Sequence, residues 1–119
     1  MKKNSKGEDL PNGYVPWTIY ILEDNNNYVG IFKLRHHLNE HLYEGGGHIG
    51  FGISKTYRNK GYASKGLSLV IDIAKNIIPE DEIYMSRFKY NEASLKAQLS
   101  NGAYVHHEND EDYFTRIKL

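Results

Sequence analysis

The stretch YRNKGYASKG, residues 57–66, brings basic side chains, two glycines and small residues together between two apolar segments. The segment after it places Leu67, Val70 and Ile71 at helical spacing, which predicts a turn leading from a strand into an amphipathic helix. Amide groups in the first turn of a helix are unpaired and can bind phosphate, and Gly61 lets a ligand approach the backbone closely. From spacing alone, a phosphate-binding turn and a plain connecting turn with solvated charges fit equally well.

Composition narrows the class of protein. A chain of 119 residues fits one domain with one core. Fifteen basic and fifteen acidic residues cancel, which argues against nucleic acid or an anionic membrane as a partner. The lack of cysteine excludes disulfides, thiolate metal sites and a cysteine nucleophile. The sequence shows no signal-peptide pattern and no apolar run of roughly 20 residues, so we expect a cytoplasmic location.

Hydrophobic patterning predicts the order of the elements. Residues 1–13 are polar, and we expect them to form a flexible lead-in to a single domain, residues 14–119. Strands are predicted at residues 17–24, 28–38, 48–54, 82–89, 103–107 and 113–119, and helices from near residue 62 to residue 78 and at residues 91–102. The order β-β-β-α-β-α-β-β is that of an α/β fold.

The strand that precedes the opening stretch is unusual. Residues 48–54 alternate Ile49, Phe51 and Ile53 with Gly50 and Gly52, which leaves one face bare. Glycine inside a strand often marks a close approach by another backbone or by a ligand. This strand therefore favours a ligand that lies along both the strand and the turn.

Three segments together resemble a known family. Arg58 to Ala63 read R-x-x-G-x-A, which resembles the acyl-CoA pyrophosphate loop of the GNAT (GCN5-related N-acetyltransferase) superfamily. The strand GGHIGFGIS, the Asn-led segment NEASLKAQLSNGA and the closing YFTRIKL are similar to a bacterial subgroup of predicted acetyltransferases in that superfamily. The resemblance covers about Tyr14 to Leu119. It implies a GNAT-like mixed, mostly antiparallel sheet flanked by helices.

The resemblance also implies a site for acetyl-CoA. The backbone of Phe51 and Ile53 would pair with the pantetheine arm like an added strand, and a backbone N–H near Ile53 would stabilise the thioester oxyanion. Asn91 matches the family asparagine that contacts the pantetheine arm. It is also suited to cap its helix, and both roles can hold. Ser94 lies one turn further along. The amides expected to hold the pyrophosphate are those of Arg58, Asn59, Lys60, Gly61, Tyr62 and Ala63.

His48 is the predicted catalytic base. Amine acetylation needs a deprotonated nucleophile, and His48 opens the strand where other family members often carry a base carboxylate. An unperturbed histidine titrates near pKa ~6.5, which suits that task. The alternative is a polar residue at a strand end with no chemical role. His36 and Glu44 are weaker candidates for the base, and the histidines lack the ligand spacing of a metal site.

Two features depart from the family pattern. Gln98 stands where many relatives have a tyrosine that protonates the leaving thiolate. Only about a dozen polar residues precede the first predicted strand, where family domains usually have a strand and two helices. We expect an N-acetyltransferase that moves an acetyl group from acetyl-CoA to an amine of a small molecule or peptide by direct attack in a ternary complex. The alternatives are a catalytically silent acyl-CoA-binding module and an interaction domain with an exposed sheet edge, and a homodimer is plausible.

Overall fold

Two antiparallel sheets form the framework of the protein, whose computed structural model describes residues 2–6 and 15–119. The first sheet has the order β1-β2-β3-β4, with β1 (Lys2–Lys6), β2 (Trp17–Asp24), β3 (Asn27–Arg35) and β4 (Ile49–Ile53). The second has the order β5-β7-β6, with β5 (Glu82–Phe88), β6 (Tyr104–Glu108) and β7 (Asp112–Lys118). The helices are α1 (Glu40–Glu44), the 3-10 turn η1 (Lys55–Tyr57), α2 (Tyr62–Ala74) and α3 (Glu92–Ser100).

The predicted α/β class and the order of the predicted elements are confirmed, with three additions, which are β1, α1 and the 3-10 turn η1. Residues 2–6, which the sequence placed in a flexible lead-in, form strand β1 and pair with β2. The rest of that lead-in, residues 1 and 7–13, and the predicted domain boundary at residue 14 lie outside the described residues. Residues 40–44, predicted as loop, form α1, because the Asn39 side chain accepts a hydrogen bond from the Leu42 N–H at 2.9 Å and caps the helix.

A two-residue turn and a β-bulge together set the register of the β2–β3 pair. Asn25 and Asn26 have φ angles of 50° and 67°, in the left-handed region that asparagine tolerates better than most residues. The turn pairs Asp24 with Asn27, and a bulge between Leu22 and Glu23 shifts the register by one residue, so that Tyr20 lies opposite Phe32. Both rings are buried, so the register directs one face of the hairpin into the core.

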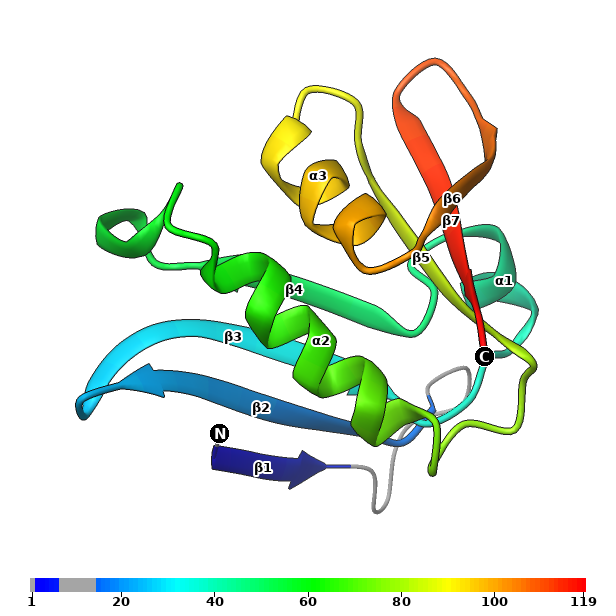
Figure 1. The fold of residues 1–119 in the computed structure, drawn as a ribbon. Coiled ribbons are helices and arrows are strands. Elements are labelled where there is room, and N and C mark those ends of the chain that lie inside the picture. The colour runs from blue at the N-terminus through cyan, green and yellow to red at the C-terminus, as the bar shows by residue number, and fades with distance from the viewer. Residues whose placement is uncertain (1, 7–14) are drawn as a thin grey trace.

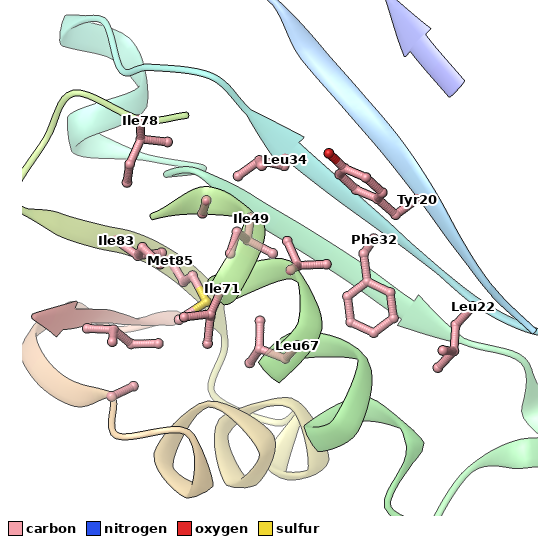
Figure 2. Close-up of a cluster of buried hydrophobic side chains, with 14 of the residues drawn as sticks. Tyr20, Leu22, Phe32, Leu34, Ile49, Leu67, Ile71, Ile78, Ile83 and Met85 are labelled. Carbon is pink, nitrogen blue, oxygen red and sulfur yellow. The ribbon is translucent and has the colours of Figure 1, made fainter. Parts of the chain in front are cut away.

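Helix α2 covers that face of the sheet. Its buried residues recur at helical spacing and include Leu67, Val70 and Ile71. Figure 2 shows the α2 side chains directed toward Phe32 and Leu34 of the first sheet on one side, and toward β5 of the second sheet on the other. One core therefore joins the two sheets. In the part of the chain that the structure describes, no helix is long and apolar enough to cross a membrane.

The two sheets meet at a single point. Gly47, just before β4, forms an isolated bridge with Met85 of β5, and β4 and β5 otherwise belong to different sheets. Figure 1 shows β4 and β5 close together at this end and diverging toward the other end, where α3 lies beside the opening. This divergence exposes one edge of β4.

Close packing of α2 on β3 depends on Gly66. A Cβ atom at this position would lie 2.3 Å from the Cζ atom of Phe32, whose ring is fully buried and cannot move aside. We expect Gly66→Ala to lower the free energy of unfolding by about 1–2 kcal/mol even though alanine favours the helix. Urea denaturation tests this. Gly50→Ala is the control, because a Cβ atom there has open space around it, and equal losses in both variants would contradict the packing argument.

Candidate functional site

A cavity of about 860 Å³ opens where β4 and β5 diverge. Its walls come from β4, from the loop after β4, from the first turn of α2, and from α3 with the residues that precede it. Eight of the residues predicted as cofactor-binding line it: Phe51, Ile53, Arg58, Asn59, Gly61, Ala63, Asn91 and Ser94. Segments far apart in the sequence are therefore brought together as the resemblance implied.

The edge of β4 presents main-chain groups to this cavity. The Arg35 N–H donates to the carbonyl of His48 at 2.7 Å and the Ser54 N–H donates to the carbonyl of Val29 at 2.7 Å. Main-chain groups alternate in direction along a strand, so the even-numbered residues of β4 bond to β3. The main-chain groups of Phe51 and Ile53 therefore point to the opposite edge, where the Phe51 N–H and C=O and the Ile53 N–H can pair with an extended ligand.

The first turn of α2 forms the second wall. Gly61 precedes the helix with φ of 84°, in the left-handed region, and no side chain caps the helix. The first amide groups of a helix have no partner within the helix, and they carry partial positive charge. A Cβ atom at Gly61 would meet no atom within 4 Å, so the glycine leaves open space beside these amides. This arrangement suits an anion.

Of the two basic residues in the loop before α2, Arg58 lines the cavity and Lys60 does not. The Arg58 Nε–H donates to the carbonyl of Ile53 at 3.0 Å, which holds the guanidinium against the edge of β4. Lys60 and Tyr62, both predicted to bind cofactor, are not among the residues that line the cavity. The Tyr62 hydroxyl donates to Asp24 and ties the start of α2 to the β2–β3 turn, while the Lys60 Nζ lies 6.0 Å from the ring centre of Tyr57.

Helix α3 supplies the opposite wall. The Asn91 side chain accepts a hydrogen bond from the Ser94 N–H at 3.2 Å, so it caps the helix, and it also lines the cavity. Gln98 is buried, where its Oε1 accepts from the Thr115 hydroxyl at 2.5 Å and its Nε2 donates to the Ser94 Oγ at 3.3 Å. Gln98 therefore holds α3 against β7 and does not reach the cavity.

Several cavity residues were missed by the sequence reasoning. Ser64 and Ser100 join the first turn of α2 to the end of α3, with their hydroxyl oxygens 2.6 Å apart. The Asn101 amide donates to the Ser64 carbonyl at 3.0 Å, although the sequence suggested only a helix stop there. Tyr90 is 82% exposed and lines the mouth of the cavity. Its position directly before the Asn-led helix was the available signal. The other missed lining residues are Gly52, Tyr57, Ala93, Lys96 and Ala97.

His48, the predicted base, is not brought to the cavity. Its side chain is fully buried, its Nε2 lies 2.9 Å from Glu80 Oε1, and its Nδ1 accepts from the Tyr84 N–H at 2.9 Å. Burial lowers the pKa of His48, and this outweighs the opposing effect of Glu80. An imidazole enclosed in this way has no nitrogen available to a substrate, so we do not place the base at His48.

The weaker candidates for the base also lie elsewhere. The Nε2 of His36 is 2.7 Å from the Thr18 hydroxyl, on the β2–β3 pair. Glu44 ends α1. Neither lines the cavity, and the described lining residues include no carboxylate and no imidazole.

The family of the chain follows from its sequence. Residues 1–103 match the family model described as "Acetyltransferase (GNAT) domain". Because this match covers most of the chain, the protein belongs to the GNAT acetyltransferase family, in agreement with the resemblance. A comparison with curated protein sequences finds no match.

Solved structures share the fold. Ribosomal-protein-S5-alanine acetyltransferase from Vibrio fischeri is 16% identical with a TM-score of 0.65, and the match covers 87% of this chain and 61% of that one. Spermidine N-acetyltransferase from Vibrio cholerae, in complex with CoA and spermine, is 14% identical with a TM-score of 0.67, covering 86% and 65%. N-acetyltransferase PseH from Campylobacter jejuni, in complex with acetyl coenzyme A, is 15% identical with a TM-score of 0.62, covering 86% and 67%. The chain thus spans less than two thirds of the length of the Vibrio fischeri and Vibrio cholerae proteins.

The capping role of Asn91 can be separated from ligand binding. We expect Asn91→Ala to lower the free energy of unfolding by about 1 kcal/mol, because the Ser94 N–H loses its partner, while Asn91→Ser keeps a capping oxygen and stays close to wild type. Urea denaturation of the three proteins measures this. Equal stability of wild type and Asn91→Ala would show that the cap contributes nothing. If Asn91→Ser is as stable as wild type, any change in its affinity for ligand reports on binding alone.

Proposed function

We propose that the protein is an acetyl-CoA-dependent N-acetyltransferase that moves the acetyl group to an amine of a small molecule or peptide. The observation that carries this proposal is the shared cavity of the β4 edge and the α2 first turn. It combines main-chain groups suited to an extended amide-containing arm with unpaired amides suited to a diphosphate. Membership of the GNAT family supports the same conclusion.

The residues present fit the parts of coenzyme A. The main-chain groups of Phe51 and Ile53 would pair with the amide groups of the pantetheine arm. The amides that follow Gly61 would hold the pyrophosphate, with the guanidinium of Arg58 and the amine of Lys96 on the same cavity adding positive charge. Asn91 and Ser94, at the start of α3, would face the arm from the other wall of the cavity.

The chemistry then follows from the position of a few groups. Acetyl-CoA supplies a thioester carbonyl whose carbon the amine attacks, and the carbon–sulfur bond breaks. The Ile53 N–H, which points away from β3, would stabilise the negative charge on the thioester oxygen. Since the described lining residues carry no carboxylate or imidazole, we expect the amine to reach the site neutral or to lose its proton to water. Gln98 cannot protonate the thiolate, which also takes its proton from water.

The structure favours one of the two alternatives over the other. A silent acyl-CoA-binding module remains a candidate, because Gln98 is turned into the core and His48 is buried at the sheet junction. An interaction domain that uses a bare edge of β2 is less favoured, because β1 pairs along β2. The amine acceptor and a homodimer stay predictions. The relatives named for spermidine and for a ribosomal protein suggest amines of both small molecules and peptides as first substrates.

Cofactor binding is tested by introducing a carboxylate next to the α2 amides. We expect Gly61→Glu to weaken acetyl-CoA binding by about tenfold or more, because the new charge opposes the pyrophosphate. Isothermal titration calorimetry measures the affinity. Gly102→Glu is a matched control, because Gly102 also has a left-handed φ of 90° and open space at Cβ but does not line the cavity. Equal affinities in the two variants, or no binding by wild type, would overturn the cofactor assignment.

Turnover separates the enzyme from the silent module. We expect polyamines, aminoglycosides or peptides to yield acetylated product with one coenzyme A thiol released per acetyl group. We expect kcat/KM to rise with pH toward the pKa of the amine itself, because the described lining residues include no carboxylate and no imidazole. Mass spectrometry and a thiol assay measure these quantities. Binding of acetyl-CoA without product from any amine in the panel would identify a silent module.

A further inference from the structure

Beside the Gly47–Met85 bridge, His48 makes two hydrogen bonds to the second sheet. The His48 N–H donates to the carbonyl of Tyr84 at 2.7 Å, and the Nδ1 of the same residue accepts from the Tyr84 N–H at 2.9 Å. Both main-chain groups of Tyr84 in β5 are therefore bonded by His48. Just beyond this contact β4 and β5 diverge (Figure 1), and the cavity lies on the far side of the divergence.

The His48 imidazole accepts a hydrogen bond that a main-chain carbonyl would accept in a regular pair of strands. The carbonyl of His48 accepts from the Arg35 N–H of β3 at 2.7 Å, so the carbonyl faces β3 while the N–H faces β5. Gly47 makes this change of direction possible with φ of 66°, and a Cβ atom there would lie 2.2 Å from the Tyr84 carbonyl oxygen. The His48 carbonyl is bonded to β3, and the His48 side chain is the acceptor for the Tyr84 N–H.

The hydrogen bonds also define the state of the ring. Because Nδ1 accepts from an N–H group, it is unprotonated, so Nε2 carries the hydrogen and donates to Glu80 Oε1 at 2.9 Å. The other carboxylate oxygen of Glu80 accepts from the Leu38 N–H at 2.9 Å. The cluster of His48, Glu80 and Tyr84 thus ties β4, β5 and the segment after β3 together.

We propose that His48 is a positioning residue whose neutral imidazole fixes the point at which β4 leaves β5, and with it the geometry of the acetyl-CoA cavity. The proposal rests on the proposed function for its link to acetyl-CoA. A protonated ring would place an N–H at Nδ1 against the N–H of Tyr84 and lose the bond. A variant that keeps only an acceptor should therefore preserve the junction.

The surroundings oppose protonation of this ring. Arg35 of β3 and His37 after it act on His48 with positive charge, while Glu80 acts in the opposite direction and the Tyr84 ring lies edge-on with its centre 5.9 Å away. Burial is the largest effect and lowers the pKa of His48 below its ordinary value of about 6.5. The unfolded chain therefore binds more protons than the folded one, so stability is full above about pH 6.5 and falls as the pH drops below it.

Two substitutions test the proposal. His48→Asn puts an amide oxygen near the place of Nδ1 and does not titrate, whereas His48→Leu has a similar size and no acceptor. At pH 7.5 we expect acetyl-CoA to bind His48→Asn within about threefold of wild type and His48→Leu about tenfold more weakly or worse. Because burial opposes protonation of the folded ring, we expect wild-type affinity to fall beyond any fall seen in His48→Asn only at a pH below the ordinary histidine pKa of about 6.5. Calorimetry at each pH measures both.

A readout without ligand keeps the test independent of acetyl-CoA. We expect the Tyr84 amide to exchange with solvent about tenfold faster in His48→Leu than in wild type at the same pH, and His48→Asn to restore its protection. Unchanged Tyr84 exchange in a folded His48→Leu, or Tyr84 exchange in His48→Asn about tenfold faster than in wild type, would overturn the proposal. If His48→Leu does not fold, the Tyr84 exchange of His48→Asn decides. Wild type that protects Tyr84 but does not bind acetyl-CoA would contradict the proposed function and leave the junction itself supported.

Discussion

The site depends on one constraint, which is that β4 stays with β5 for a single contact and then leaves it. If the two strands paired along their length, the main-chain groups of Phe51 and Ile53 would bond to β5 and the cavity would close. The core under α2 allows the strands to part, because α2 packs against residues of both sheets (Figure 2). The burial of shared apolar surface thus holds the sheets together where hydrogen bonds do not.

Polar side chains on α2 and α3 hold the walls of the cavity in place. Asn101 and the Ser64–Ser100 pair hold α3 against the first turn of α2, and Gln98 holds it against β7. These bonds fix the walls of the cavity and leave the α2 amides open beside Gly61. A ligand with an anionic group and an amide-containing arm meets both features at once, which is why acetyl-CoA fits better than a simple anion.

The sequence predicted those parts of the fold and site that are encoded locally. The turn at Gly61, the alternation in β4 and the cap at Asn91 each carry their signal within a few residues, so the cavity residues on them were predictable. The sequence did not predict that His48 lies away from the cavity, because its imidazole bonds to Glu80 and Tyr84, 32 and 36 residues away. No periodicity shows that a histidine at a strand end is turned inward. Strand β1 was missed for a similar reason, because the polar sequence KKNSK pairs with β2 through its main chain.

The most direct test of this account is a map of backbone amide chemical shifts as acetyl-CoA is added to the ¹⁵N-labelled protein. The account predicts that the largest changes fall on Phe51 and Ile53, on residues 58–64 and on Asn91 and Ser94, while the amides of β1 and β2 stay unchanged. Saturable changes on a different surface, or no changes at millimolar acetyl-CoA, would contradict the claim that the divergence of β4 and β5 forms an acetyl-CoA site.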